Sequence, residues 1–209
     1  MSESLEAWFA ANGWRAFDFQ REVWAAYRAG ASGLVHSATG TGKTLAAFLG
    51  PVAEAIEEGA KGAPPLRVLW ITPMRALAGD TVQSLAKAAE GAGLAWTVGI
   101  RTGDTTAAER AKQARKLPTA LVTTPESLSL MLSQAEARER LAGVRAVIVD
   151  EWHELLGNKR GVQVELALAR LAADGIPVAI AMAGGYGRDI DDTVAIHAAT
   201  ILAAKRILG

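Results

Sequence analysis

The stretch Ser37-Ala38-Thr39-Gly40-Thr41-Gly42-Lys43-Thr44 decides which fold we expect for this chain. It follows a short apolar run at residues 33–36 and precedes a helical pattern that begins at Leu45. A strand, a glycine-containing loop and a helix in this order form a phosphate-binding loop, in which backbone N–H groups and the positive helix terminus face an anion. The strict pattern has glycine at the position of Ser37, so an ordinary strand–loop–helix turn is the alternative.

The loop supplies candidate ligands for the phosphates of a nucleotide and for a metal ion. Gly40 and Gly42 let the backbone turn so that its N–H groups point inward. The Lys43 ammonium can reach the β- and γ-phosphates, and the Thr44 hydroxyl can bind Mg²⁺. The predicted nucleotide contacts in this loop are Thr39, Gly40, Thr41, Gly42, Lys43 and Thr44.

Length and composition fit one large α/β domain. The 209 residues are 50% hydrophobic and 21% charged, which allows a substantial core. The 22 basic and 22 acidic side chains cancel, so nucleic acid would have to bind through a local patch. The chain has no cysteine, which excludes disulfides and thiolate metal sites. Because no apolar run reaches membrane-spanning length and no secretion signal is apparent, we expect a cytoplasmic protein without membrane contact.

Short apolar runs alternate with helical patterns along the chain. This alternation predicts one doubly wound, mostly parallel sheet of about six strands, with helices on both faces. Two amphipathic helices are expected before the first strand, at residues 5–11 and 19–28. The predicted strands are 33–36, 66–72, 95–100, 120–123, 144–149 and 177–183, and the later helices are 44–58, 75–90, 105–115, 126–133 and 162–173.

A second polar segment, Asp150-Glu151-Trp152-His153, follows the apolar strand at residues 144–149. Parallel strands bind ligands at their carboxyl ends, so this segment and the glycine loop are expected at the same edge of the sheet. Asp150 would hold Mg²⁺ together with Thr44, and Glu151 would polarise an attacking water as a general base, with Lys43 beside it. Paired carboxylates after a buried strand can instead cap the next helix, which is the alternative.

Six segments occur in the order found in superfamily 2 helicases. They are residues 13–20, the glycine loop, residues 72–77, Arg101-Thr102-Gly103-Asp104, residues 124–128 and Asp150-Glu151-Trp152-His153. Over about residues 1–171 the chain resembles the first RecA-like domain of bacterial ligase-associated DEXH-box helicases, which are relatives of the large helicase-related proteins. The resemblance implies a RecA-like fold, ATP and Mg²⁺ as cofactors, and single-stranded DNA as a partner.

The resemblance also implies roles for individual residues. Gln20 would hydrogen-bond the adenine, unless it is an ordinary solvated helix residue. His153 would relay between the nucleotide and a neighbouring domain, or merely pack or cap. Apart from the resemblance, most of the six tryptophans are expected in the core or in a groove wall, and Trp152 is the exception that is expected to border the nucleotide crevice. The resemblance implies that the sugar–phosphate backbone of one nucleic-acid strand contacts Thr72, Pro73, Arg75, Arg101, Thr102, Thr124, Pro125 and Glu126. As isolated segments these residues would be ordinary helix caps or turns, which is the alternative.

Related helicases close two RecA-like domains around the nucleotide, and the second domain supplies arginine fingers. Losing such an arginine commonly costs on the order of 10³–10⁵ in rate. A length of 209 residues leaves no room for that second domain. We therefore expect weak or absent ATP turnover, little or no unwinding by this chain alone, and weak, salt-sensitive binding of single-stranded DNA.

The chain departs from the helicase pattern after residue 171, because the Ser-Ala-Thr motif of these helicases is absent. Residues 175–204 resemble the C-terminal strand–loop–helix of bacterial histone-deacetylase-like proteins of the acetoin-utilisation type, with Tyr186 at the position of their functional tyrosine. The zinc ligands of that family are missing, and the three histidines lack metal-ligand spacing, so we expect neither zinc nor deacetylase activity.

The tail therefore has a structural interpretation. Residues 175–209 would add a strand and a sheet-covering helix to the helicase-like residues 1–171, so that residues 1–209 form a single domain. Two hypotheses follow. The chain is the nucleotide-binding half of an ATP-dependent helicase, or it is an engineered or recombined chimera that retains only residual nucleotide binding.

Overall fold

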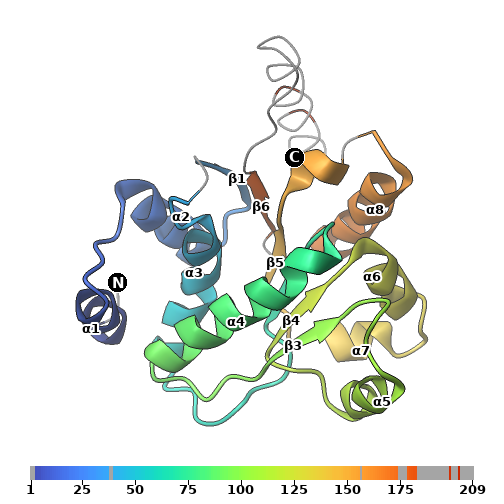
Figure 1. The fold of residues 1–209 in the computed structure, drawn as a ribbon, viewed down its shortest axis with the longest axis horizontal. Helices are drawn as coiled ribbons and strands as arrows, with labels where there is room; N and C mark the ends of the chain where they lie inside the picture. The colour runs from blue at the N-terminus through green and yellow to red at the C-terminus, as the bar shows by residue number, and fades with distance from the viewer. Residues whose placement is uncertain are drawn as a thin grey trace.

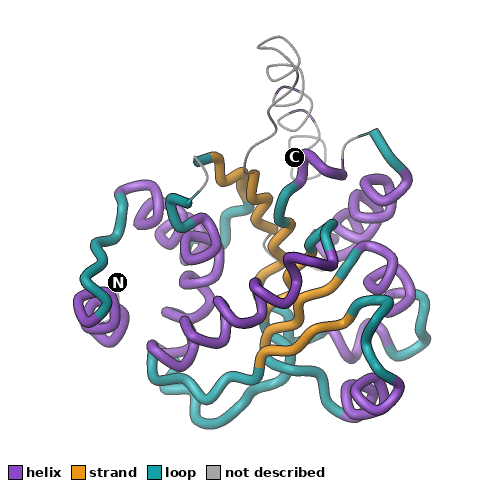
Figure 2. The backbone as a smooth tube through the Cα atoms, viewed as in Figure 1, coloured by secondary structure: helices purple, strands orange, loops and turns teal. Residues whose placement is uncertain are grey.

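The strands of the computed structural model lie in one sheet, and the structure describes residues 3–37, 40–155, 157–173 and 178–182, with residues 198 and 202. Within these residues every neighbouring pair of strands is parallel. The strands are β1 (Gly33–His36), β2 (Val68–Ile71), β3 (Val98–Arg101), β4 (Ala120–Thr123), β5 (Ala146–Val149) and β6 (Val178–Met182). Their order across the six-stranded sheet is β1-β6-β5-β2-β4-β3 (Figures 1 and 2).

The helices lie where the apolar periodicity predicted them, with boundaries that differ by a few residues. A short helix and a 3₁₀ helix were not predicted. The helices are α1 (Glu3–Ala11), α2 (Asp18–Arg28), α3 (Lys43–Glu57), α4 (Arg75–Gly91), α5 (Ala107–Arg115), α6 (Pro125–Leu132), the unpredicted α7 (Ala137–Leu141), the unpredicted 3₁₀ helix η1 (Trp152–Leu155) and α8 (Lys159–Ala173).

Both faces of the sheet are covered, as predicted for a doubly wound α/β domain. Successive residues of a strand point to opposite faces. In β2, Val68 and Trp70 pack in the cluster formed with α1 to α4, whereas Leu69 and Ile71 pack in the cluster formed with α6, η1 and α8. Figure 1 shows α4 crossing in front of the sheet. This arrangement confirms the predicted fold class.

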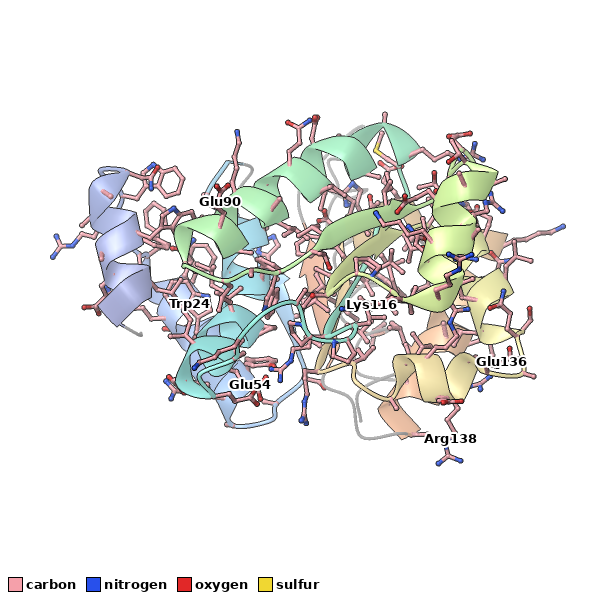
Figure 3. All side chains as sticks on the ribbon, turned by 90° about the horizontal axis from the view of Figure 1, so that it is seen from below. Trp24, Glu54, Glu90, Lys116, Glu136 and Arg138 are labelled. Atoms are coloured by element: carbon pink, nitrogen blue, oxygen red, sulfur yellow. The ribbon has the colours of Figure 1, made fainter. Side chains whose placement is uncertain are left out.

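The N-terminal helices are fixed against the start of α3. Trp24 of α2, which is labelled in Figure 3, is buried. Its Nε1 donates to the Leu45 carbonyl at 3.3 Å. Its ring meets Phe9 of α1 edge to face, with 6.0 Å between the centroids, a geometry that stabilises aromatic pairs. Since Leu45 directly follows the glycine loop, this contact places α2 beside that loop.

The predicted strand at residues 177–183 is present as β6, between β1 and β5. The predicted tail helix and Tyr186 lie outside the described residues. None of the helices in the described part of the chain combines the length and apolar character needed to cross a membrane.

Candidate functional site

The glycine loop joins β1 to α3 with the backbone geometry that a phosphate-binding loop needs. Gly40 has φ +80°, and Gly42, the residue that caps the start of α3, has φ +82°. Both values lie in the left-handed region that favours glycine. Lys43 and Thr44 are the first two residues of α3, whereas Thr39 lies outside the described residues.

Polar side chains of the loop hold it in shape. Lys43 Nζ donates to the Ser37 carbonyl at 2.7 Å, and the hydroxyls of Ser37 and Thr41 share a hydrogen bond. The first helical hydrogen bond of α3 runs from Ala46 N to Gly42 O. The amides that precede Ala46 therefore have no partner within the helix, and such amides can face an anion.

The acid pair follows β5 and lies at the same edge of the sheet as the glycine loop, because β1, β6 and β5 are parallel neighbours. Asp150 N donates to Ile71 O at 2.8 Å, and Asp150 Oδ1 accepts from Glu151 N at 3.0 Å. Glu151 has φ +48°, which is strained for a residue with a side chain. The chain therefore turns sharply after Asp150 and enters η1.

Lys43, Asp150 and Glu151 lie close enough to shift one another's pKa. Burial lowers the pKa of Lys43, and the charges of Glu151 and Asp150 oppose this change. Burial raises the pKa of Asp150, against the opposing effects of the Glu151 amide and Lys43. Burial, followed by the charge of Asp150, raises the pKa of Glu151 to about 7. The structure thus brings the loop lysine and both acids to one place.

The oxygen donors at this place fit Mg²⁺. Mg²⁺ prefers oxygen ligands and usually binds one or two carboxylates together with phosphate oxygens and water. Asp150 supplies a largely buried carboxylate beside the loop, and Thr44 supplies a hydroxyl in the first turn of α3. These two residues would hold the ion, which would neutralise phosphate charge.

Gln20 connects α2 to the glycine loop. It is 2% exposed, so the alternative of a solvated helix residue is wrong. Its Oε1 accepts from Phe17 N at 3.0 Å, and its Nε2 donates to Gly42 O at 3.0 Å. Because a side-chain amide has two donors and two acceptor positions, one of each remains for a base. Adenine recognition by Gln20 stays a prediction.

Two aromatic residues beside Gln20 were missed by sequence reasoning. A cavity of about 310 Å³ lies next to the glycine loop, and Trp14 and Phe17 form part of its wall. Their side chains are 50% and 56% exposed, which is unusual for such large apolar groups. The sequence could have indicated them, because both aromatic residues lie within six positions before Gln20, the residue predicted to contact the adenine.

The predicted nucleic-acid residues also lie at the carboxyl ends of strands. Thr72 follows β2, Thr102 follows β3 and Thr124 follows β4. Their exposed fractions are 0%, 4% and 1%, and each hydroxyl is hydrogen-bonded within its own turn. These hydroxyls therefore stabilise the turns, and contact of Thr72, Thr102 and Thr124 with nucleic acid stays a prediction.

Basic side chains form a local patch at this end of the sheet. Arg75, the first residue of α4, lies 3.3 Å from Asp104 in an exposed ion pair. Arg101 ends β3, and burial, followed by the charges of Arg140 and Arg110, lowers its pKa. The neutral chain thus carries a cluster of arginines near the turn after β3.

Pro125 and Glu126 begin α6, as predicted for a helix start with proline in its first turn. Glu126 pairs with Arg160, a residue that was not predicted. Burial alone would raise the pKa of Glu126, but the backbone amide and Arg160 outweigh burial and lower it. The carboxylate therefore stays charged and faces Arg160, so Glu126 supports the segment, while its contact with nucleic acid stays a prediction.

Trp152 does not border the nucleotide crevice, so that prediction is wrong. Its side chain is fully buried among Leu155, Val164 and Leu168. The neighbouring His153 lies between two acids: Nδ1 is 3.4 Å from Glu151 Oε2, and Nε2 is 3.4 Å from Glu154 Oε1. His153 is thus part of the acid cluster, while its relay role remains a prediction.

Known proteins are similar to this chain in sequence and in fold. Residues 17–193 match the family described as DEAD/DEAH box helicase. The chain belongs to this family. The helicase domain is 41% identical over 162 residues to the Lhr helicase/probable uracil glycosylase of Mycolicibacterium smegmatis, covering 73% of the chain and 11% of that protein. It is 42% identical over 149 residues to the ATP-dependent helicase Lhr-Core of Methanothermobacter thermautotrophicus, covering 66% of the chain and 17% of that protein.

Solved structures agree with this assignment. The structure of Mycobacterium smegmatis helicase Lhr bound to ssDNA and AMP-PNP superposes with a TM-score of 0.70 at 36% identity, over 92% of the helicase domain and 26% of that chain. The DEAD-box helicase Mss116 bound to ssRNA and UDP-BeF superposes with a TM-score of 0.77 over 100% of the domain and 41% of that chain, at 18% identity, which supports the fold alone. The helicase domain therefore spans a minor part of its relatives.

The family match extends beyond residue 171, after which the sequence analysis predicted a segment from a different family. It runs to residue 193, past residue 171, and β6 pairs with β1 and β5 in the parallel register of the other strands. Neither the relatives nor the solved structures support a histone-deacetylase-like segment or a chimera in this helicase domain.

Proposed function

We propose that this chain is the nucleotide-binding N-terminal motor domain of an Lhr-type ATP-dependent DNA helicase. The observation that carries the proposal is the meeting of Lys43, Asp150 and Glu151 at the carboxyl edge of the sheet. The Lhr relative whose structure holds AMP-PNP and ssDNA supports both ligand classes. Membership of the ligase-associated subgroup remains a prediction.

The nucleotide would sit across the glycine loop. Its phosphates would contact Lys43 and the loop amides, with Thr44 and Asp150 holding Mg²⁺. Glu151 would polarise the attacking water, a role that suits a carboxylate whose pKa is raised to about 7. The base would enter the cavity between the loop and the aromatic residues Trp14 and Phe17.

We expect slow ATP turnover by the domain itself. Lys43 would face the transferred phosphoryl group and Glu151 the attacking water, whereas in the helicases that this chain resembles the arginine fingers come from a second RecA-like domain. Such a finger is worth on the order of 10³–10⁵ in rate. The relatives are several times longer than this chain, so the partner domain would come from outside these 209 residues.

Single-stranded DNA is expected to bind weakly at the turns after β2, β3 and β4. The measurement is fluorescence anisotropy with a short labelled oligo-dT at two salt concentrations. Three to four phosphate contacts predict an affinity that falls roughly 20- to 50-fold between about 50 mM and about 200 mM salt, because each contact adds about −0.7 to the logarithmic slope.

A matched pair of arginine variants tests the location. Arg75→Ala should reduce the salt slope by about 0.7, since one phosphate contact is lost. Arg138→Ala should leave the slope unchanged, because Arg138 lies on α7, before β5 begins, and its side chain points away from the fold (Figure 3). Equal effects of the two variants, or salt-independent binding, would contradict the proposed nucleic-acid surface.

A further inference from the structure

Arg160, the second residue of α8, holds two of the strand-end segments at once. Its Nη2 donates to the carbonyl oxygen of Pro73, after β2, at 2.6 Å. Its Nε lies 2.6 Å from Glu126 Oε1, at the start of α6, and its Nη2 lies 3.5 Å from Glu126 Oε2. Figure 1 shows the beginnings of α4 and α6 beside α8. One guanidinium thus joins the two turns at which we expect single-stranded DNA to bind.

The backbone that carries Arg160 is fixed to η1 by Asn158. Asn158 Nδ2 donates to Glu154 O at 2.9 Å, and its Oδ1 accepts from Arg160 N at 2.9 Å and from Gly161 N at 3.1 Å. This is a side-chain cap on the first turn of α8. The cap ties the beginning of α8 to the helix that directly follows the acid pair.

Gly161 lets η1 and the first turn of α8 pack in close contact. A Cβ atom at Gly161 would lie 2.0 Å from the Leu155 carbonyl oxygen, which belongs to the backbone of η1. No larger residue fits without moving one helix relative to the other. A shift of η1 must therefore be followed by the first turn of α8, and with it by Arg160.

We propose that Arg160 is a positioning residue that couples occupation of the nucleotide site to the geometry of residues 72–77 and 124–128. The inference rests on the proposed function. Nucleotide and Mg²⁺ act on Asp150 and Glu151, η1 follows these acids in the chain, and Asn158 and Gly161 transmit its position to Arg160. A planar guanidinium can hold a carbonyl and a carboxylate together, which the single ammonium of lysine cannot do in the same geometry.

Hydrogen exchange with and without Mg–ADP, read by mass spectrometry on short peptides, tests this coupling. In the unsubstituted chain, Mg–ADP should slow exchange at residues 40–45 and also, by about fivefold, at residues 72–77 and 124–128. In Arg160→Ala the slowing at residues 40–45 should persist, while both distant responses disappear. Arg170→Ala is the matched control, since Arg170 on the same helix bonds only to the Leu132 carbonyl at 3.2 Å among the described contacts, and it should keep all three responses.

Glu126→Gln tests the two contacts of Arg160 separately, because it changes the contact with residue 126 and keeps the arginine. It weakens the ion pair with Arg160 but leaves the bond from Arg160 to the Pro73 carbonyl. The response at residues 124–128 should therefore fall while the response at residues 72–77 remains. This variant also tests the coupling if Arg160→Ala does not fold.

The outcomes distinguish the proposed function from the coupling. No effect of Mg–ADP on residues 40–45 of the unsubstituted chain would overturn the proposed function, and the coupling with it. A response at residues 40–45 without any at residues 72–77 and 124–128 would overturn the coupling alone. Unchanged distant responses in Arg160→Ala would do the same.

Discussion

Lys43→Ala is expected to weaken Mg–ADP binding in a calorimetric titration, raising Kd by on the order of 100-fold. The Lys43 ammonium lies close enough to Asp150 and Glu151 for their charges to raise its pKa against the effect of burial. Without it, two carboxylates remain beside the phosphates, so the variant loses an attraction and keeps a repulsion. Charge-assisted contacts to phosphate are among the strongest polar contacts in proteins.

The same substitution should barely change the free energy of unfolding. Burial lowers the pKa of Lys43, which means that folding disfavours its charged form, and alanine removes that cost. The lost hydrogen bond to Ser37 O acts in the opposite direction, so we expect a net change below about 1 kcal/mol. Lys87→Ala, at an exposed position of α4, is the control and should bind Mg–ADP normally. Equal Kd values for the two variants would argue against a phosphate role for Lys43.

Trp152→Ala should lower the free energy of unfolding by about 3–5 kcal/mol, as measured by urea denaturation. The ring is fully buried in the core cluster that also contains Leu155, Val164 and Leu168, so its removal leaves a cavity in that core. Trp152 begins η1 and directly follows Asp150 and Glu151 in the chain, so a shift of η1 would move the acid pair. Loss of stability is therefore expected to accompany weaker nucleotide binding.

Two tryptophan substitutions make the stability prediction specific. Trp14→Ala should cost no more than about 1.5 kcal/mol, because that ring is half exposed and makes mainly edge contacts with Trp8 and Phe9. Trp152→Phe should also cost less than about 1.5 kcal/mol, since the Trp152 Nε1 has no hydrogen-bond partner among the described residues. A similar loss in Trp14→Ala and Trp152→Ala would contradict the burial argument.

Local patterns in the sequence predicted the sheet and the meeting of its two polar segments. The strand at residues 33–36, the glycine loop and the acids after residue 149 all carry their signal within a few residues. Parallel pairing then places Lys43, Asp150 and Glu151 at one edge without further information. This is why the fold class and the core of the candidate site could be predicted.

Features that depend on distant partners could not be predicted in this way. Arg160 meets Pro73 across 87 residues and Glu126 across 34 residues, and no local pattern indicates such contacts. Trp152 follows a left-handed turn at Glu151 and is fully buried, and no local pattern in the sequence indicates either feature. Burial of the threonine hydroxyls after β2, β3 and β4 is likewise a property of the assembled sheet, so the sequence could not exclude these hydroxyls as direct contacts.

A crystal structure of the chain grown with Mg–ADP tests the central claim most directly. We predict the β-phosphate against Lys43 Nζ and the amides of the glycine loop, with a Mg²⁺ ion bound by the Thr44 hydroxyl and facing Asp150. A nucleotide bound elsewhere, or a Mg²⁺ ion remote from both Thr44 and Asp150, would contradict the claim that the loop lysine and the acid pair serve one phosphate group.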